Sequence, residues 1–207
     1  MDIMEGIRTR RSVTRLAEPA IADAELLDLL NAAMMAPDHG RLTPWRLITL
    51  RGEERATLGR ALAEAAGAAG PVASRQAAER PFLAPLLITI VFCPVDHPRV
   101  PQWEQLAATT AVVHNLTLLL HGYGYGSIWR TGGVTEEPCV RRALGLRDHE
   151  QLLGWLYVGT AAGPCPPRPS REPERQLSSL TQLSGNAAWH GPGGQDTWAP
   201  TRSLQEH

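Results

Sequence analysis

The stretch QWEQLAATTAVVHNLTLLLH, residues 102–121, decides the fold that we expect for this chain. Its middle, LAATTAVVHNLTLLL, is apolar or small on nearly every side of a 3.6-residue period, which predicts one long helix in a buried, central position. Such a helix needs neighbours on all of its sides. In a chain of 207 residues, a second copy of the same chain is a natural source of some of them.

A short apolar run precedes this helix in the sequence. Its core, LLITIVF within residues 85–93, is too short for a helix of ordinary length and is rich in branched side chains. Both properties are typical of a strand that is covered on both faces. Further strands are expected at residues 46–50, 126–129 and 153–159.

Helical patterns alternate irregularly with these strands. Asp2 and Glu5 have the spacing of a capping box before a short N-terminal helix, and Asp23 can cap a second helix that Pro37 ends. Other helices are expected at residues 53–69 and 136–144, with a further helical turn or two at 75–80. Because the order shows no clean βα repeat, the sequence favours an α+β fold.

The charged residues exclude several classes of function. The formal net charge is −1, from 20 basic and 21 acidic residues that are well mixed, so we expect neither a nucleic-acid partner nor a membrane partner. All 20 basic residues are arginine. Without lysine the chain cannot form a Schiff base, anchor pyridoxal phosphate or build a P-loop, and a bound phosphate must be held by guanidinium groups and backbone amides.

Cysteine and histidine give no sign of a metal site. Cys93, Cys139 and Cys165 are odd in number, widely spaced and without a C-x-x-C pair, and the histidines show no metal-binding spacing. The N-terminus lacks the apolar core of a signal peptide, and no eighteen apolar residues occur in a row. We therefore expect a cytoplasmic protein with no metal ion.

The segment TRRSVTR, residues 9–15, brings guanidinium groups and hydroxyls close together at the end of the first helix. An anion there would gain charge-assisted hydrogen bonds from arginine and neutral bonds from Ser12 and nearby amides. A solvated basic turn is the other interpretation, because short basic runs are common. The segment by itself leaves both interpretations open.

Two later segments could display functional groups. APDHGRLTPW, residues 36–45, places His39 in a loop, where a surface or capping role is the ordinary alternative. GYGYGSIWRTGG, residues 122–133, contains glycines that let the backbone approach a flat ligand, although they also suit a tight helix-to-strand turn. Neither the dinucleotide-binding spacing GxGxxG nor the nucleophile elbow GxSxG is present in the second segment.

Five motifs follow one another along residues 2–160: RRSVTR, APDHGRLTPW, VPQWEQ, GYGSIWRTGG and GWLYVGT. In this order and spacing they resemble the nitroreductase family, and within it the short YdjA-type branch. The resemblance implies a nitroreductase-like α+β fold, with a central, mainly antiparallel sheet flanked by helices, in an intertwined homodimer with shared active sites. The domain would span residues 1–163. A Pro/Gly/Arg-rich extension over 164–207 would wrap the partner or be partly disordered.

The resemblance also implies FMN as the cofactor and NAD(P)H as the co-substrate. By motif position, the cofactor-binding residues would be Arg10, Arg11, Ser12, Met35, His39, Thr131, Gly132 and Gly133. The first three would hold the phosphate and ribityl end, His39 would contact the flavin, and residues 131–133 would line the ring. The nicotinamide side would be formed by Gly122, Tyr123, Gly124, Tyr125, Gly126 and Ser127.

The chain departs from the pattern of this branch at three positions. It has Met35, Gly40 and Thr43 where the branch often has arginine, lysine and glutamine. Arg41 is a candidate replacement for the lost charge. Arg168 and Arg171 are further candidate phosphate contacts, because longer members of the family bring a late arginine to the phosphate.

The implied activity is an FMN-dependent NAD(P)H oxidoreductase with a ping-pong mechanism. Hydride would pass from the nicotinamide to flavin N5 and then to a nitroaromatic, a quinone or a similar small-molecule acceptor, so no catalytic side chain is expected. Two alternatives stay open. One is a specialised flavoenzyme of the same fold, such as a dehydrogenase, a dehalogenase or a flavin-processing enzyme, and the other is a flavin-binding dimer without turnover.

Overall fold

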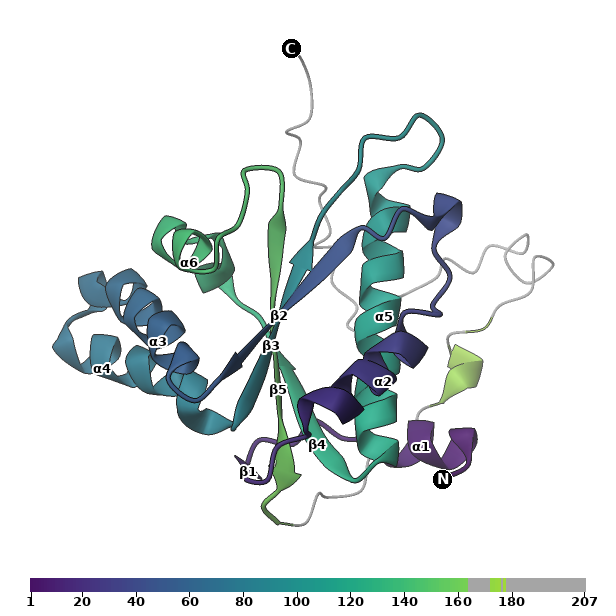
Figure 1. Cartoon of the computed structure of the whole chain (residues 1–207), viewed down its shortest axis with the longest axis horizontal. Helices are drawn as coiled ribbons and strands as arrows, with labels where there is room; N and C mark the ends of the chain where they lie inside the picture. The colour runs from purple at the N-terminus through teal and green to yellow at the C-terminus, as the bar shows by residue number, and fades with distance from the viewer. Residues whose placement is uncertain (164–171, 176, 178–207) are drawn as a thin grey trace. The chain divides into compact units, whose positions relative to one another are not determined.

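The computed structural model describes residues 1–163, 172–175 and 177, and one sheet forms the centre of the described part (Figure 1). Its strands are β1 (Leu16–Ala17), β2 (Trp45–Arg51), β3 (Leu86–Phe92), β4 (Tyr125–Arg130) and β5 (Gln151–Ala161). β3 pairs with β2 and β5, and β5 also pairs with β4 and β1; all these ladders are antiparallel. The expected α+β fold with a mainly antiparallel sheet is therefore confirmed.

Helices cover both faces of this sheet. α2 (Asp23–Ala33) and α5 (Gln102–Gly122) lie on one face, and α3 (Glu54–Ala65), α4 (Pro71–Glu79) and α6 (Pro138–Ala143) lie on the other (Figure 1). Each layer has its own apolar cluster against the strands. All seven residues of β3 are buried between the two clusters, which confirms a strand covered on both faces.

The long helix α5 is buried on one face only. Side chains such as Val112, Leu116 and Leu120 pack against the sheet and α2. On other faces, His114 is exposed and Trp103 is 68% exposed. The short α1 (Ile3–Thr9) lies beside the C-terminal half of α5 (Figure 1). The all-round apolar pattern of α5 is thus only partly covered within one chain.

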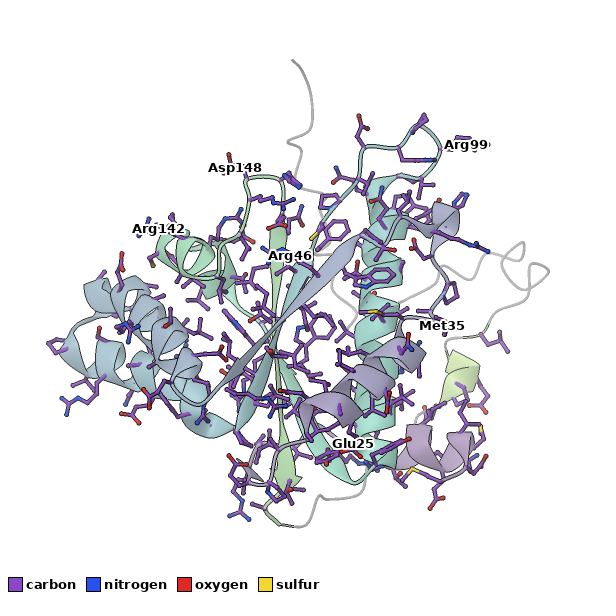
Figure 2. The ribbon with its side chains drawn as sticks, in the orientation of Figure 1. Glu25, Met35, Arg46, Arg99, Arg142 and Asp148 are labelled. Carbon is purple, nitrogen blue, oxygen red and sulfur yellow. The ribbon has the colours of Figure 1, made fainter. Side chains whose placement is uncertain are left out.

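An ion pair with a buried carboxylate joins β2 to the turn before β5. The Arg46 guanidinium, labelled in Figure 2, donates from Nε to Glu150 Oε1 at 2.8 Å and from Nη2 to Oε2 at 2.7 Å. The Arg147 amide donates to the same carboxylate at 2.8 Å, and Glu150 is only 2% exposed. The hydrogen bonds from Arg46 lower the pKa of Glu150 from 4.5 to about 2, although burial acts in the opposite direction.

Several expected helix ends were wrong. Neither Asp2 nor Asp23 caps a helix through its side chain: Asp2 makes no capping hydrogen bond, and Asp23 is already inside α2, where it pairs with Arg51 at 2.9 Å. The helix expected at 53–69 ends as α3 at Ala65 and continues as a short 3-10 helix over Gly67–Ala69. Two other helices begin at a proline and not at the expected residue. α4 begins at Pro71, although the helical turns were expected from residue 75, and α6 begins at Pro138, although its helix was expected from residue 136.

The chain divides into a unit of Met1–Arg168, which contains the whole sheet, and a unit of Pro169–His207. Of the second unit the structure describes residues 172–175 and 177, including a 3-10 helix over Pro173–Arg175. The domain boundary expected at 163 and the role of the extension stay predictions. Within the described residues, no helix is both long enough and apolar enough to span a membrane.

Candidate functional site

The arginine-rich segment after α1 lies against the beginning of β4. An isolated parallel bridge joins Ser12 to Ser127, and the Val13 amide donates to the Ser127 carbonyl at 3.0 Å. These two serines are far apart in the sequence. Their contact brings the first and fourth of the sequence motifs to one place in the fold.

A cavity of about 170 Å³ lies at this contact. It is lined by Arg10, Ser12, His114, Thr117, Ser127, Ile128 and Trp129. A guanidinium group beside several hydroxyls fits a phosphate ester with a polyol arm. The Thr117 hydroxyl donates to the His114 carbonyl at 2.7 Å, so its oxygen is left to accept from a ligand hydroxyl. Small-molecule sites usually measure roughly 300–1,000 Å³, so the cavity suits one part of such a ligand.

The structure separates the roles of the two adjacent arginines. Arg10 lines the cavity, whereas Arg11 folds back on α1. Arg11 Nη1 donates to the carbonyl oxygens of Arg8 at 2.6 Å and Arg10 at 2.9 Å. A cation at the C-terminal end of a helix satisfies free carbonyls and interacts favourably with the helix dipole. Arg11 therefore supports the turn that carries Arg10.

Residues 131–133 follow β4 directly, at the end of the strand away from Ser127. At about 3.3 Å per residue, Thr131 lies roughly 13 Å along the strand from Ser127. All three residues are exposed, and a side chain added at Gly132 or Gly133 would meet no atom within 4 Å. A ligand that begins in the cavity can thus extend along β4 toward open backbone.

The six residues assigned to the nicotinamide side do not line one cavity. Ser127 lies in the cavity with Arg10, while Gly122 and Tyr123 line a different groove beside α1. The Tyr125 hydroxyl donates to Glu25 at 2.8 Å. Gly126 is buried, and an added Cβ would lie 2.8 Å from the Leu16 side chain. Their nicotinamide role stays a prediction, as does that of Gly124.

The second motif forms a loop that is anchored at both ends. His39 Nδ1 and Glu104 Oε2, from the first turn of α5, are 2.9 Å apart, and the Thr43 amide donates to Asp38 Oδ2 at 2.7 Å. Arg41 has a φ of 53° and Thr43 a φ of 50°, a left-handed conformation that is costly outside glycine. These contacts hold the imidazole in place on an exposed loop.

Met35 and Arg41 lie on the α2 side of this loop. They line a cavity of about 560 Å³, together with Met34, Ala36, Asp38, Thr43 and Trp45. Met35 is 77% exposed, at the end of α2 (Figure 2). Within one chain, neither residue joins Arg10 and Ser12 in their cavity.

A fixed length of α5 separates the His39 loop from the Arg10 cavity. His39 contacts Glu104, whereas His114 lines the Arg10 cavity. At 1.5 Å per residue, these two helix positions are about 15 Å apart along the axis. Within one chain, the His39 loop and the Arg10 cavity therefore lie at different places along α5.

A model of the nitroreductase family matches residues 7–160 of the chain. The chain belongs to the nitroreductase family. This nitroreductase-family chain is 40% identical over 162 residues to “Putative NAD(P)H nitroreductase YdjA” of Escherichia coli (strain K12), covering 77% of this chain and 88% of that protein. It is 28% identical over 159 residues to YfhC of Bacillus subtilis (strain 168), covering 74% and 81% of the two chains. The YdjA-type branch expected from the motifs is confirmed.

Solved structures agree with this family. A nitroreductase-like family protein from Bacillus cereus has a TM-score of 0.75 and 27% identity, covering 87% of this chain and 96% of the other. The FMN and NADPH-dependent nitroreductase NfnB from sphigopyxis sp. strain HMH has a TM-score of 0.69 at 20% identity, covering 86% of this chain and 99% of the other. The second likeness shows the shared fold.

The sequence motifs of this chain did not reveal every residue of the candidate site. His114 and Thr117 lie inside the long apolar helix, and only their spacing of three residues on one helix face could have signalled them. Glu104 stands within VPQWEQ, but nothing local links it to His39. Arg168 and Arg171 lie outside the described residues. Among the described residues, no three His, Cys, Asp or Glu side chains form a group that could hold a metal ion.

Proposed function

We propose that this chain is an FMN-dependent NAD(P)H oxidoreductase that acts as a homodimer. The observation that carries the proposal is the cavity in which Arg10 and Ser12 meet Thr117 and Ser127 at the beginning of β4. Its donors and acceptors suit a phosphate and a polyol. The chain has no lysine to neutralise a phosphate, so this task falls to arginine.

The residues of the site have separate tasks in this proposal. Arg10 balances the phosphate charge, and the hydroxyls of Ser12, Thr117 and Ser127 bond the phosphate and polyol oxygens. The backbone at Gly132 and Gly133 leaves room for a flat ring, and backbone amides can stabilise negative charge on such a ring. When bound, FMN supplies hydride transfer between the nicotinamide and the acceptor. The protein orients these groups and keeps one face of the ring accessible, which suits nitroaromatic or quinone acceptors.

Colour and redox response test the proposed activity. Purified protein, reconstituted with FMN, is expected to be yellow, with absorbance at about 450 nm that NADH or NADPH bleaches without oxygen. A nitroaromatic or quinone should then restore the colour. A colourless protein that cannot be reconstituted would refute the proposal. Yellow protein that neither nucleotide bleaches would favour a flavin-binding dimer without turnover.

An apolar groove beside α1 supports the homodimer. Its volume is about 400 Å³, and it is lined mainly by apolar parts of α1 and the C-terminal half of α5. Met1 is 65% exposed, Ile3 72% and Tyr123 59%. Apolar side chains gathered in this way usually mark an interface. A second copy would also cover the exposed face of α5, for which the sequence predicts neighbours.

The positions of the His39 loop and the Arg10 cavity are a second reason to propose a homodimer. In the proposed homodimer, the His39 loop of one copy completes the Arg10 cavity of the other. Within one chain, these parts lie about 15 Å apart along α5, between Glu104 and His114. Each dimer would then hold two shared sites.

Mixed dimers test whether the sites are shared. Arg10→Ala and His39→Ala each damage both sites of a uniform dimer. In a purified heterodimer with one variant chain of each kind, a shared arrangement leaves one site intact and the other doubly altered. We therefore expect one equivalent of FMN to bind with wild-type affinity, as measured by titration. Loss of both wild-type sites in the heterodimer would show that each site belongs to one chain.

A further inference from the structure

α5 carries two histidines beside the proposed phosphate site. His114, Thr117 and His121 are three and four residues apart, so they lie on one face of the helix. His114 and Thr117 line the cavity with Arg10 and Ser12. His121 lies one turn further along, where its Nε2 is 2.8 Å from Thr9 Oγ1. The two imidazoles therefore flank the segment that carries Arg10.

The hydrogen bonds at Thr9 fix which atom of His121 carries a proton. The Thr9 hydroxyl donates to the Glu5 carbonyl at 2.7 Å, so its single hydrogen is already used. The Thr9 oxygen must then accept from His121 Nε2–H. A second proton on Nδ1 would leave this bond intact. His121 can change its charge without losing its anchor on α1.

The charged groups that face His121 are Glu5 on α1 and Arg10 and Arg11 in the segment that follows. Burial lowers the pKa of His121, and the charges of Arg10 and Arg11 lower it further, while Glu5 acts in the opposite direction. A phosphate monoester carries a charge of about −1.5 to −2 at pH 7. Such an anion would offset the field of the two arginines and favour the charged imidazole.

We propose that His114 and His121 are further residues of the phosphate site, and that His121 takes up a proton when a phosphate monoester binds. This inference rests on the proposed function, which supplies FMN as the ligand. In a chain without lysine, the His121 imidazole can supply additional positive charge beside Arg10 near neutral pH. Binding and protonation then favour each other, so affinity falls as the pH rises.

The pH dependence of flavin affinity tests this inference. The full chain, freed of flavin, is titrated with FMN and with riboflavin, which lacks the phosphate, between about pH 6.5 and 8.5, above the second phosphate pKa near 6. The Kd for FMN should rise up to about tenfold per pH unit for each coupled proton, and the Kd for riboflavin should stay constant. Calorimetry at pH 7 in buffers of different ionisation enthalpy counts the protons taken up with FMN.

Variants identify the groups that take up the protons. His121→Gln should reduce proton uptake and flatten the pH profile for FMN, and glutamine at 121 keeps a donor for Thr9. The matched control is His149→Gln, because His149 is exposed on the turn before β5. It should behave as wild type. Thermal unfolding of each variant shows that the chain still folds.

The outcomes separate this inference from the proposed function. FMN binding with a Kd that does not change with pH, or proton uptake that His121→Gln retains, would overturn the role of His121. Absence of FMN binding at every pH would overturn the proposed function and this inference together. If the Kd values for riboflavin and FMN depend equally on pH, proton uptake does not respond to the phosphate. That result would also overturn this inference.

Discussion

Replacement of Glu150 by alanine is expected to lower the free energy of unfolding by about 3 kcal/mol. The carboxylate is 2% exposed and accepts hydrogen bonds from Arg46 and from the Arg147 amide. Its loss leaves the Arg147 amide and the Arg46 guanidinium, whose side chain is 35% exposed, without this buried acceptor. Urea unfolding at equal protein and flavin concentrations measures the change, because a dimer or a bound cofactor also contributes to stability.

An exposed ion pair provides the matched control. Glu64 lies 3.5 Å from Arg142, with side chains that are 65% and 72% exposed. Surface pairs of this kind contribute little, so Glu64→Ala should change the free energy of unfolding by no more than about 0.5 kcal/mol. An equally small change for Glu150→Ala would show that the buried pair does not stabilise the fold.

The lowered pKa of Glu150 makes the free energy of unfolding depend on pH. The pKa of Glu150 is lowered from 4.5 to about 2, so the folded protein binds the proton less tightly than the unfolded chain. The stabilisation, about 3 kcal/mol, is complete above pH 4.5 and is lost as the pH falls toward 2. The difference in unfolding free energy between wild type and Glu150→Gln should stay constant from neutral pH down to about pH 5 and shrink below it.

Replacement of Arg10 by alanine is expected to raise the Kd for FMN about 10- to 100-fold. A charge-assisted hydrogen bond to a phosphate contributes about 1.5–3 kcal/mol, and Arg10 is the arginine that lines the cavity. Ser12→Ala removes a neutral bond and should raise the Kd about threefold to tenfold. Fluorescence titration of flavin-free protein measures both values.

Two controls make the Arg10 result specific. Riboflavin lacks the phosphate, so its Kd should change little in Arg10→Ala. Arg142→Ala removes an exposed arginine on α6, which covers the opposite face of the sheet, and should leave FMN affinity unchanged (Figure 2). Wild-type FMN affinity in Arg10→Ala would place the phosphate elsewhere.

The sequence predicted the parts of the fold whose signals are local. β3 was recognisable because seven mostly branched residues, six of them apolar, stand together, as burial on both faces requires. The period of α5 likewise revealed a long helix. Helix ends were predicted less well, since Asp2 and Asp23 have suitable side chains that make no capping bond. The order of the five motifs predicted the nitroreductase family without any information about contacts between residues.

Only the tertiary structure decided how the site is assembled. It placed Ser12 against Ser127, added His114 and Thr117 to Arg10, and turned Arg11 back to α1. It also held His39 on Glu104, about 15 Å along α5 from His114. Local patterns record which residues form a helix or a strand and which of their faces is buried. The meeting of distant segments depends on how whole helices and strands pack, and no local pattern contains that information.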